Sequence, residues 1–141
     1  MPIRNGSACW EGNLKDGSGT VEFANFSEPY SHTARFEEGN GTNPEELIGA
    51  AHAACFSMAL SNNLSTAGFI PKKVTTIAQV SLEVGDQGAK ITQIELNCNA
   101  LVPGIDEPTF LEHAESTKTG CPVSQALSAT PIKLTAKLLE S

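Results

Sequence analysis

The chain has 141 residues, enough for one ordinary domain with a buried core and too few for two comfortable ones, so we expect a single domain over residues 1–141. Hydrophobic residues make up 40% of the chain and charged residues 18%, a globular composition that excludes a largely disordered protein. The nine Lys and Arg residues are scattered and the formal net charge is −7, which argues against a nucleic-acid partner.

The N-terminal segment and the cysteines together indicate a compartment. Residues 1–7 lack the apolar core of a signal peptide, and no run approaches the length of a membrane span, so we expect a cytosolic protein without a membrane partner. Four cysteines stand at positions 9, 55, 98 and 121. In the cytosol thiols rest in the reduced form, and a disulfide that does form there is more often catalytic or sensory than structural.

The first forty residues have the pattern of short strands. Residues 7–10, 20–23 and 33–36 are rich in β-branched and aromatic side chains, and Gly-, Asp- and Asn-rich turns separate them. This pattern predicts an antiparallel meander of three strands.

A long helix is predicted from Pro44 to about residue 66. Asn43 suits the N-cap, Pro44 suits the first helical position, and Glu46 completes a capping box. Gly68 suits the left-handed residue that ends a helix. Small residues fill positions 49–55 except for His52, which would let another backbone, even that of a second copy in a dimer, come unusually close.

One stripe of this helix is apolar at helical spacing. Its members are Leu47, Ile48, Ala51, Ala54, Cys55, Met58 and Ala59. We therefore expect this stripe to be buried, with Cys55 in the middle of the helix.

The second half of the chain predicts a β-hairpin, two short helices and a last strand. Alternating runs at 74–84 and 91–102 are joined by a Gly-Asp-Gln-Gly turn. Helices are expected at 107–118 and from Cys121-Pro122 onward, and a strand at 131–139. The order β-β-β-α-β-β-α-α-β predicts an α+β domain.

Cys121 is a candidate reactive thiol. It stands where a helix N-cap is expected, so the helix dipole and free N–H groups should stabilise its thiolate. The alternative is that Gly-Cys-Pro is a turn in which a small residue caps the helix, and the residues alone leave both interpretations open.

Cys55 gains nothing from a helix dipole at mid-helix, and burial alone would disfavour its thiolate. It needs a cation nearby, for which Arg35 is a candidate; otherwise it is an ordinary small hydrophobe. Glu46 is accounted for by the capping box, so Glu45 is the better functional candidate of the two glutamates, although an acidic residue in a first helical turn is favourable in itself.

The same residues also allow other chemistries. His52 precedes Cys55 by three residues, which allows a cysteine-histidine nucleophile for acyl transfer, although no third residue to orient the imidazole is evident. A metal site formed by His52, Cys55 and Cys121 lacks recognisable ligand spacing, so neither a metal nor a cofactor is expected. A non-catalytic redox sensor is a third possibility. Cys9 and Cys98 lie in predicted strands and are expected to be structural.

Two motifs carry a resemblance to a known family. Residues 42–60, with Asn-Pro-Glu-Glu followed by a helical cysteine, and residues 120–127, with Gly-Cys-Pro-Val-Ser-Gln, closely resemble the osmotically induced protein C and organic hydroperoxide resistance (OsmC/Ohr) family. Residues 8–12, 33–37 and 102–106 are similar to the osmotically induced branch specifically. The resemblance implies an OsmC-like α+β fold, with antiparallel sheets around a long central helix, in an intertwined homodimer.

The resemblance also implies a function. Members of the family are cysteine-based peroxidases of organic hydroperoxides and, less readily, hydrogen peroxide. Position by position, Cys55 resembles the peroxidatic cysteine, Cys121 the resolving cysteine, Arg35 the arginine that stabilises the thiolate, and Glu45 the acid that holds this arginine. A dihydrolipoyl group or lipoylated protein is the implied reductant. The helix-start argument favours Cys121 as the more reactive thiol, whereas the resemblance assigns the attack on peroxide to Cys55.

Overall fold

The structure is a computed structural model that describes residues 1–140. The chain divides into two compact units, Met1–Leu47 and Ile48–Ser141, each with its own three-stranded sheet. The element order β-β-β-α-α-β-β-α-α-β confirms the α+β class.

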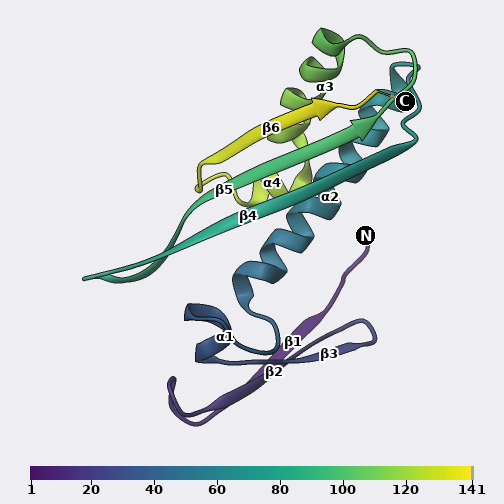
Figure 1. Cartoon of the computed structure of the whole chain (residues 1–141). Helices are drawn as coiled ribbons and strands as arrows, with labels where there is room; N and C mark the ends of the chain where they lie inside the picture. Colours follow the sequence, from purple (N-terminus) through teal and green to yellow (C-terminus); the bar gives the residue numbers. More distant parts are fainter. Residues whose placement is uncertain (141) are drawn as a thin grey trace. The chain divides into compact units, whose positions relative to one another are not determined.

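The first unit contains an antiparallel sheet in the order β1-β2-β3, shown at the purple end of the chain in Figure 1. Its strands are β1 (Gly6–Glu11), β2 (Ser18–Phe23) and β3 (Phe26–Tyr30). Trp10 and Tyr30 pack with their ring centroids 5.3 Å apart. The predicted meander is therefore confirmed for its first two strands.

The third predicted strand is wrong, because residues 33–36 belong to the short helix α1 (His32–Phe36). Ser31 caps this helix, since its hydroxyl accepts a hydrogen bond from the Ala34 N–H at 3.1 Å. The true third strand contains Pro29, which a strand tolerates only at an edge, and β3 is an edge strand. Because proline normally argues against a strand, the sequence pattern does not predict this one.

Helix α2 spans Pro44–Thr66 as predicted. The Asn43 side chain accepts a hydrogen bond from the Glu46 N–H at 2.8 Å, which confirms the N-cap. The capping box is not reciprocal, because the Glu46 carboxylate accepts from the Thr42 hydroxyl at 3.0 Å. At the other end Gly68 has a φ of +97°, and the Phe69 N–H reaches back to the Leu64 carbonyl at 2.9 Å, so the predicted left-handed stop is confirmed.

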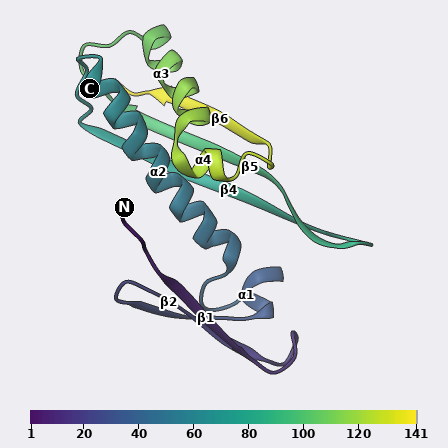
Figure 2. The same cartoon turned by 180° about the vertical axis from the view of Figure 1, so that it is seen from behind.

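The second unit is a sheet covered on one face by helices. The strands β4 (Lys73–Gly85) and β5 (Gly88–Leu101) form the predicted antiparallel hairpin. The strand β6 (Ile132–Leu138) pairs with β5 in parallel, which corrects the expectation of purely antiparallel sheets. Figure 2 shows α2, α3 (Glu107–Gly120) and α4 (Pro122–Ala126) on the same side of this sheet. Because α3 and α4 lie between β5 and β6 in sequence, the last strand can enter parallel to its neighbour.

The core of the second unit lies between α2, α3 and the inner face of the sheet. Its buried members are Phe56, Leu60, Leu64, Ile94, Leu96, Cys98, Ala100, Val102, Phe110 and Ala114. The helix lies close to the sheet at Gly49, where an added Cβ would lie 3.1 Å from the Ala78 carbonyl oxygen. The predicted close backbone approach is therefore made here by a strand of the same chain.

The prediction of the buried stripe on α2 is wrong. The buried positions of the helix within the second unit are Gly49, His52, Phe56, Leu60 and Leu64, at intervals of three or four residues. Ala51, Ala54 and Met58 on the opposite side are exposed, and Met58 keeps 75% of its surface. The helix is weakly amphipathic because alanines occur on both sides, so hydrophobic spacing could not identify the inward face.

Candidate active site

The two predicted redox cysteines lie together in the second unit. Cys55 is half-buried near the middle of α2, and Cys121 is the N-cap of α4 with 1% of its surface exposed. Cys121 is near enough to Cys55 to raise its pKa, and all four cysteines are free thiols. Two free thiols 66 positions apart in the sequence are thus neighbours in the second unit.

The surroundings of Cys55 disfavour its thiolate. Burial raises the pKa of Cys55 above its ordinary value, a hydrogen bond from the Val123 backbone lowers it, and the hydrogen bond and charge of Cys121 raise it again. The net shift is upward. All of these influences come from the second unit, and none of them is a cation.

Cys121 is held by the start of α4. Its sulfur accepts the Ser124 N–H at 3.3 Å and donates to the Ser124 hydroxyl at 3.1 Å. Its own N–H donates to the Thr117 carbonyl at 3.0 Å, at the end of α3. The predicted N-cap position is confirmed, and the two contacts with Ser124 fix the direction of the sulfur.

His52 lies beside this pair and is fully buried. Its Nε2 is 2.7 Å from the Ser124 hydroxyl oxygen, and its Nδ1 is buried without a hydrogen-bond partner among the described residues. Burial lowers the pKa of His52 from its ordinary value, so the ring is neutral near pH 7. Ser124 was not foreseen from the sequence, although its place three residues after an N-cap cysteine is the signal that would have identified it.

Arg35 and Glu45 form a bidentate ion pair within the first unit. The Arg35 Nε and Nη2 atoms each donate to a different carboxylate oxygen of Glu45, both at 3.0 Å. The Glu45 side chain is 9% exposed and that of Arg35 is 35% exposed. The guanidinium also lies 5.4 Å from the centroid of the Phe36 ring. A carboxylate and an aromatic face therefore hold the guanidinium in one orientation.

A hollow of about 380 Å³ opens beside Arg35 in the first unit. Its lining is largely apolar and aromatic. The residues are Trp10, Gly12, Leu14, Tyr30, Ser31, His32, Arg35, Phe36 and Pro44. Such a hollow suits an organic group placed next to a cation.

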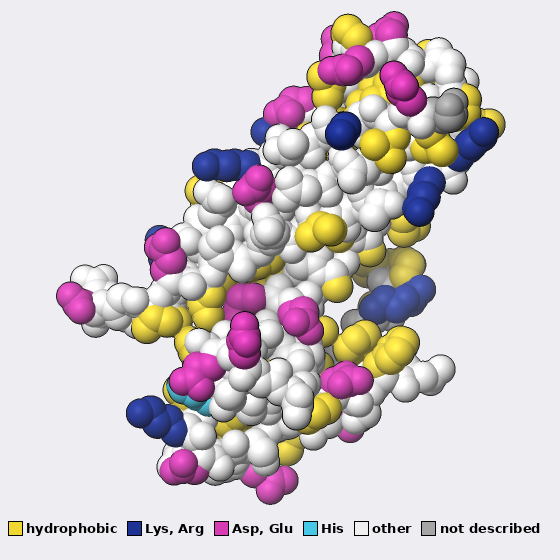
Figure 3. All heavy atoms as spheres, in the orientation of Figure 1, with side chains coloured by type: hydrophobic (Ala, Val, Ile, Leu, Met, Phe, Trp, Pro, Cys, Tyr) yellow, Lys and Arg dark blue, Asp and Glu magenta, His cyan; other side chains and the backbone are white. Residues whose placement is uncertain are grey.

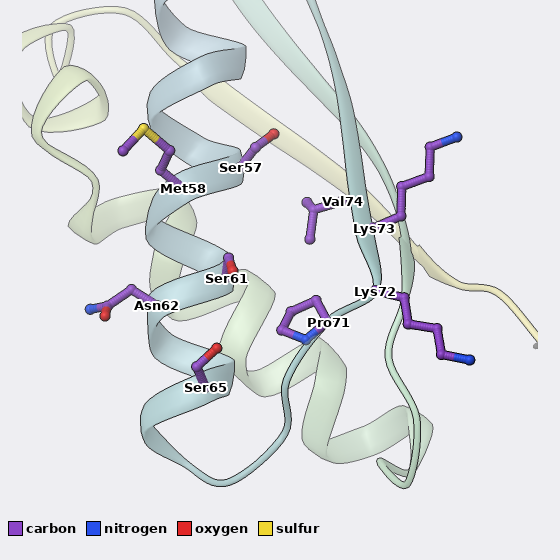
Figure 4. A pocket seen from close by; sticks show the side chains of 9 residues that line it. All are labelled: Ser57, Met58, Ser61, Asn62, Ser65, Pro71, Lys72, Lys73 and Val74. Carbon is purple, nitrogen blue, oxygen red and sulfur yellow. The ribbon is translucent and has the colours of Figure 1, made fainter.

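A larger hollow, of about 550 Å³, lies along α2 in the second unit (Figure 4). Figure 4 shows the side chains of Ser57, Ser61 and Ser65 on the side of the helix that faces Pro71 and Val74, while the amines of Lys72 and Lys73 point away from the helix. No thiol lines this hollow, so it offers no redox chemistry of its own.

The remaining chemical groups of the described residues are separate from the thiol pair. Cys98 is 2% exposed in the core and burial raises its pKa, while Cys9 is exposed on β1. In residues 1–140 no group of three or more His, Cys, Asp or Glu side chains is arranged to hold a metal ion. On the face shown in Figure 3, lysine and arginine side chains are dispersed among acidic ones. Nor does any helix within that range combine the length and apolar character needed to cross a membrane.

Known proteins resemble this chain along most of its length. The sequence model of a family described as OsmC-like protein matches residues 37–137. The chain is 53% identical over 129 residues to Peroxiredoxin OsmC of Escherichia coli K12. This alignment covers 89% of this chain and 90% of that protein. Among solved structures, an OsmC-like protein of Mycoplasma pneumoniae has a TM-score of 0.77 at 17% identity and covers 98% of both chains. The organic hydroperoxide resistance protein OhrB of Bacillus subtilis has a TM-score of 0.69 at 23% identity and covers 96% of this chain and 98% of its own.

Proposed function

The chain belongs to the OsmC-like protein family, and we propose that it is a cysteine-based peroxidase that reduces hydroperoxides at the expense of thiols. One observation carries the proposal most directly. Cys55 and Cys121 are both free thiols, and Cys121 is near enough to influence the pKa of Cys55, which supports their assignment as a redox pair. The identity of 53% to a protein named Peroxiredoxin OsmC supports the same chemistry.

The reaction has three steps. The Cys55 thiolate attacks one oxygen of the hydroperoxide, the O–O bond breaks, and an alkoxide leaves and is protonated to the alcohol. Cys55 is then a sulfenic acid, and the Cys121 thiol condenses with it to give a disulfide and water. An external dithiol reduces this disulfide to two thiols and is itself oxidised to a disulfide.

We assign Arg35 and Glu45 to the first step. Burial and Cys121 raise the pKa of Cys55, so the thiolate needs a cation to stabilise it. The guanidinium of Arg35 supplies that charge and also stabilises the oxygen that leaves. The two hydrogen bonds from Arg35 to Glu45 hold the guanidinium in one orientation, which leaves its remaining N–H groups free to donate.

The substrate class follows from the hollow beside Arg35. Trp10, Tyr30 and Phe36 give it aromatic walls, and its volume of about 380 Å³ accommodates an organic substituent. A hydroperoxide whose organic group occupies this hollow gains apolar contact that hydrogen peroxide cannot make. Organic hydroperoxides are therefore the preferred substrates.

The functional protein is a homodimer in this proposal. The exposed side of α2 presents Ala51, Ala54 and Met58 to solvent, and small apolar residues of this kind suit close packing of a second copy. In this proposal residues 1–141 form one peroxidase domain. The protein is located in the cytoplasm, where it serves in defence against oxidative and osmotic stress. Its electron donor is a dithiol, a dihydrolipoyl group or a lipoylated protein.

A donor comparison tests the function. The purified protein is mixed with cumene hydroperoxide and with dihydrolipoamide, glutathione or thioredoxin, and peroxide loss and product alcohol are measured. We expect turnover with dihydrolipoamide. Failure with all three donors, with the thiols intact, would contradict the peroxidase function.

Serine variants assign the two cysteines. Cys55→Ser should abolish peroxide loss, whereas Cys121→Ser should still consume about one equivalent and then stop. Cys9→Ser, which alters an exposed cysteine on β1, is the matched control and should turn over normally. Peroxide consumption by Cys55→Ser together with none by Cys121→Ser would reverse the assignment. The acyl-transfer alternative gains no support, because His52 directs its Nε2 at Ser124.

A further inference from the structure

Two buried residues next to the thiol pair have no part in the three steps above. His52 has no exposed surface, and Ser124 has 3% exposed. Both are polar, and both lie on elements that carry a reactive cysteine, α2 and α4. Burying polar groups costs stability unless they are satisfied, so their presence here calls for a reason.

Hydrogen bonds connect these residues in a chain from Cys121 through Ser124 to His52. The Cys121 thiol donates to the Ser124 hydroxyl oxygen at 3.1 Å, and this oxygen lies 2.7 Å from His52 Nε2. A serine hydroxyl has one proton to donate. The Ser124 oxygen can accept from both neighbours, and in the tautomer whose Nε2 is unprotonated the Ser124 hydroxyl donates its own proton to Nε2.

The second ring nitrogen of His52, Nδ1, indicates that this hydrogen-bond chain is more than structural. In this arrangement Nδ1 carries the ring proton, yet Nδ1 is buried with no hydrogen-bond partner among the described residues. An apolar side chain of similar size would fill the same space without an orphaned N–H group. We therefore assign the imidazole a role beyond packing, in which an unprotonated Nε2 takes up a proton that reaches it through Ser124.

We propose that Ser124 and His52 form a relay that takes the proton of Cys121 when this cysteine attacks the sulfenic acid of Cys55. The inference rests on the proposed peroxidase function and deepens it. Ser124 touches the reacting sulfur, whereas His52 acts through Ser124 and is a positioning residue. The relay gives Cys121 a base, which a buried thiol that must become a nucleophile otherwise lacks.

The protons and electrons balance over this step. The Cys121 proton moves to the Ser124 oxygen as the Ser124 proton moves to His52 Nε2, and the thiolate attacks the Cys55 sulfur. The S–S bond forms, the S–O bond breaks, and the hydroxide leaves with the bonding pair and is protonated to water. Ser124 also lines a hollow of about 450 Å³ with Lys118 and Thr130, through which the proton on His52 returns to solvent. The sum is thiol plus sulfenic acid to disulfide plus water.

A single-turnover experiment separates this step from peroxide reduction. The reduced full chain is mixed with one equivalent of cumene hydroperoxide without an added reductant. Peroxide loss reports the oxidation of Cys55, dimedone traps the sulfenic acid, and mass spectrometry measures the disulfide. The variants are Ser124→Ala and His52→Gln, which break the relay at different atoms, and Ser124→Thr, which keeps the hydroxyl.

The expected result is a delay confined to the second step. Peroxide loss should stay within about twofold of wild type, while disulfide formation in Ser124→Ala and His52→Gln slows by at least about tenfold, the lower end of what a positioned base contributes, and the sulfenic acid accumulates. Ser124→Thr should restore the rate. Ser57→Ala is the matched control, because Ser57 lies on the same helix and its hydroxyl makes a hydrogen bond of 2.7 Å to Thr76 and none to Cys55 or Cys121.

Two results would overturn the relay. One is disulfide formation near the wild-type rate in a relay variant, and the other is an equal slowing of both steps, which indicates general disruption. Each variant is first shown to unfold cooperatively, and either Ser124→Ala or His52→Gln alone is sufficient for the decision. A wild-type protein that consumes no peroxide would instead contradict the proposed function, so the two failures are distinguishable.

Discussion

The ion pair between Arg35 and Glu45 can be measured as a coupling energy. The perturbation is alanine at each position singly and at both together. An exposed ion pair contributes about 0.2–1 kcal/mol, whereas breaking a buried pair costs about 3–5 kcal/mol. With the Glu45 side chain 9% exposed and that of Arg35 35% exposed, this pair lies between the two cases. Its two charge-assisted hydrogen bonds of 3.0 Å, discounted for solvent at the arginine, give an expected coupling of about 1–2 kcal/mol.

Urea unfolding of the wild type, both single variants and the double variant gives the four free energies of the cycle. Glu115 and Lys118 supply the matched control, since their ion pair is short, at 2.6 Å, but Glu115 is 61% exposed. The control cycle should give a coupling of about 0.5 kcal/mol or less. A coupling for Arg35 and Glu45 no larger than that of the control would refute the view that Glu45 holds the guanidinium in place.

The remaining predictions concern the thiols, the histidine and the exposed side of α2. Cys121→Ala removes two influences that raise the pKa of Cys55, so the thiolate absorbance at 240 nm should titrate at lower pH; an unchanged or higher pKa would contradict the pairing. Burial lowers the pKa of His52 below 6.5, so the unfolded chain binds the extra proton and stability is lost as pH falls below about 6.5, by at most about 1.4 kcal/mol per pH unit from this group. His52→Gln should remove that part of the slope in urea unfolding between pH 5 and 7, and an unaltered slope would refute the assignment. Met58→Glu should shift a homodimer toward monomer in sedimentation, while Thr75→Glu, at an exposed position on β4, should not; a dimer unaffected by Met58→Glu would place the interface elsewhere.

The sequence predicts elements well where the local signals agree. Helix α2 has an N-cap at Asn43, a proline at its first position and a glycine stop at Gly68, and its predicted bounds are confirmed. The hairpin of β4 and β5 has alternating residues and a glycine-rich turn, and it is confirmed as well. Each of these signals depends on a few neighbouring residues, so no tertiary information is needed to read it.

The predictions fail where tertiary contacts, rather than neighbouring residues, determine the structure. The edge position of β3 makes Pro29 acceptable in a strand, and this position is not visible from local sequence. The inward face of α2 depends on which side meets the sheet, and alanines on both sides conceal it. Ser124 is likewise an ordinary helix residue until the fold brings it to His52, 72 positions away in the sequence.

The requirements for a reactive Cys55 explain why the family resemblance names four residues rather than two. Within the second unit, burial and Cys121 both work against the thiolate, and a single backbone hydrogen bond from Val123 favours it. These surroundings suit the sulfenic acid and the disulfide, which are neutral, better than the initial nucleophile. If Cys55 is the nucleophile, as we propose, it needs a cation that the groups acting on its pKa within residues 48–140 do not supply. In the proposed function Arg35 supplies this charge, and its two hydrogen bonds to Glu45 hold the guanidinium in one orientation.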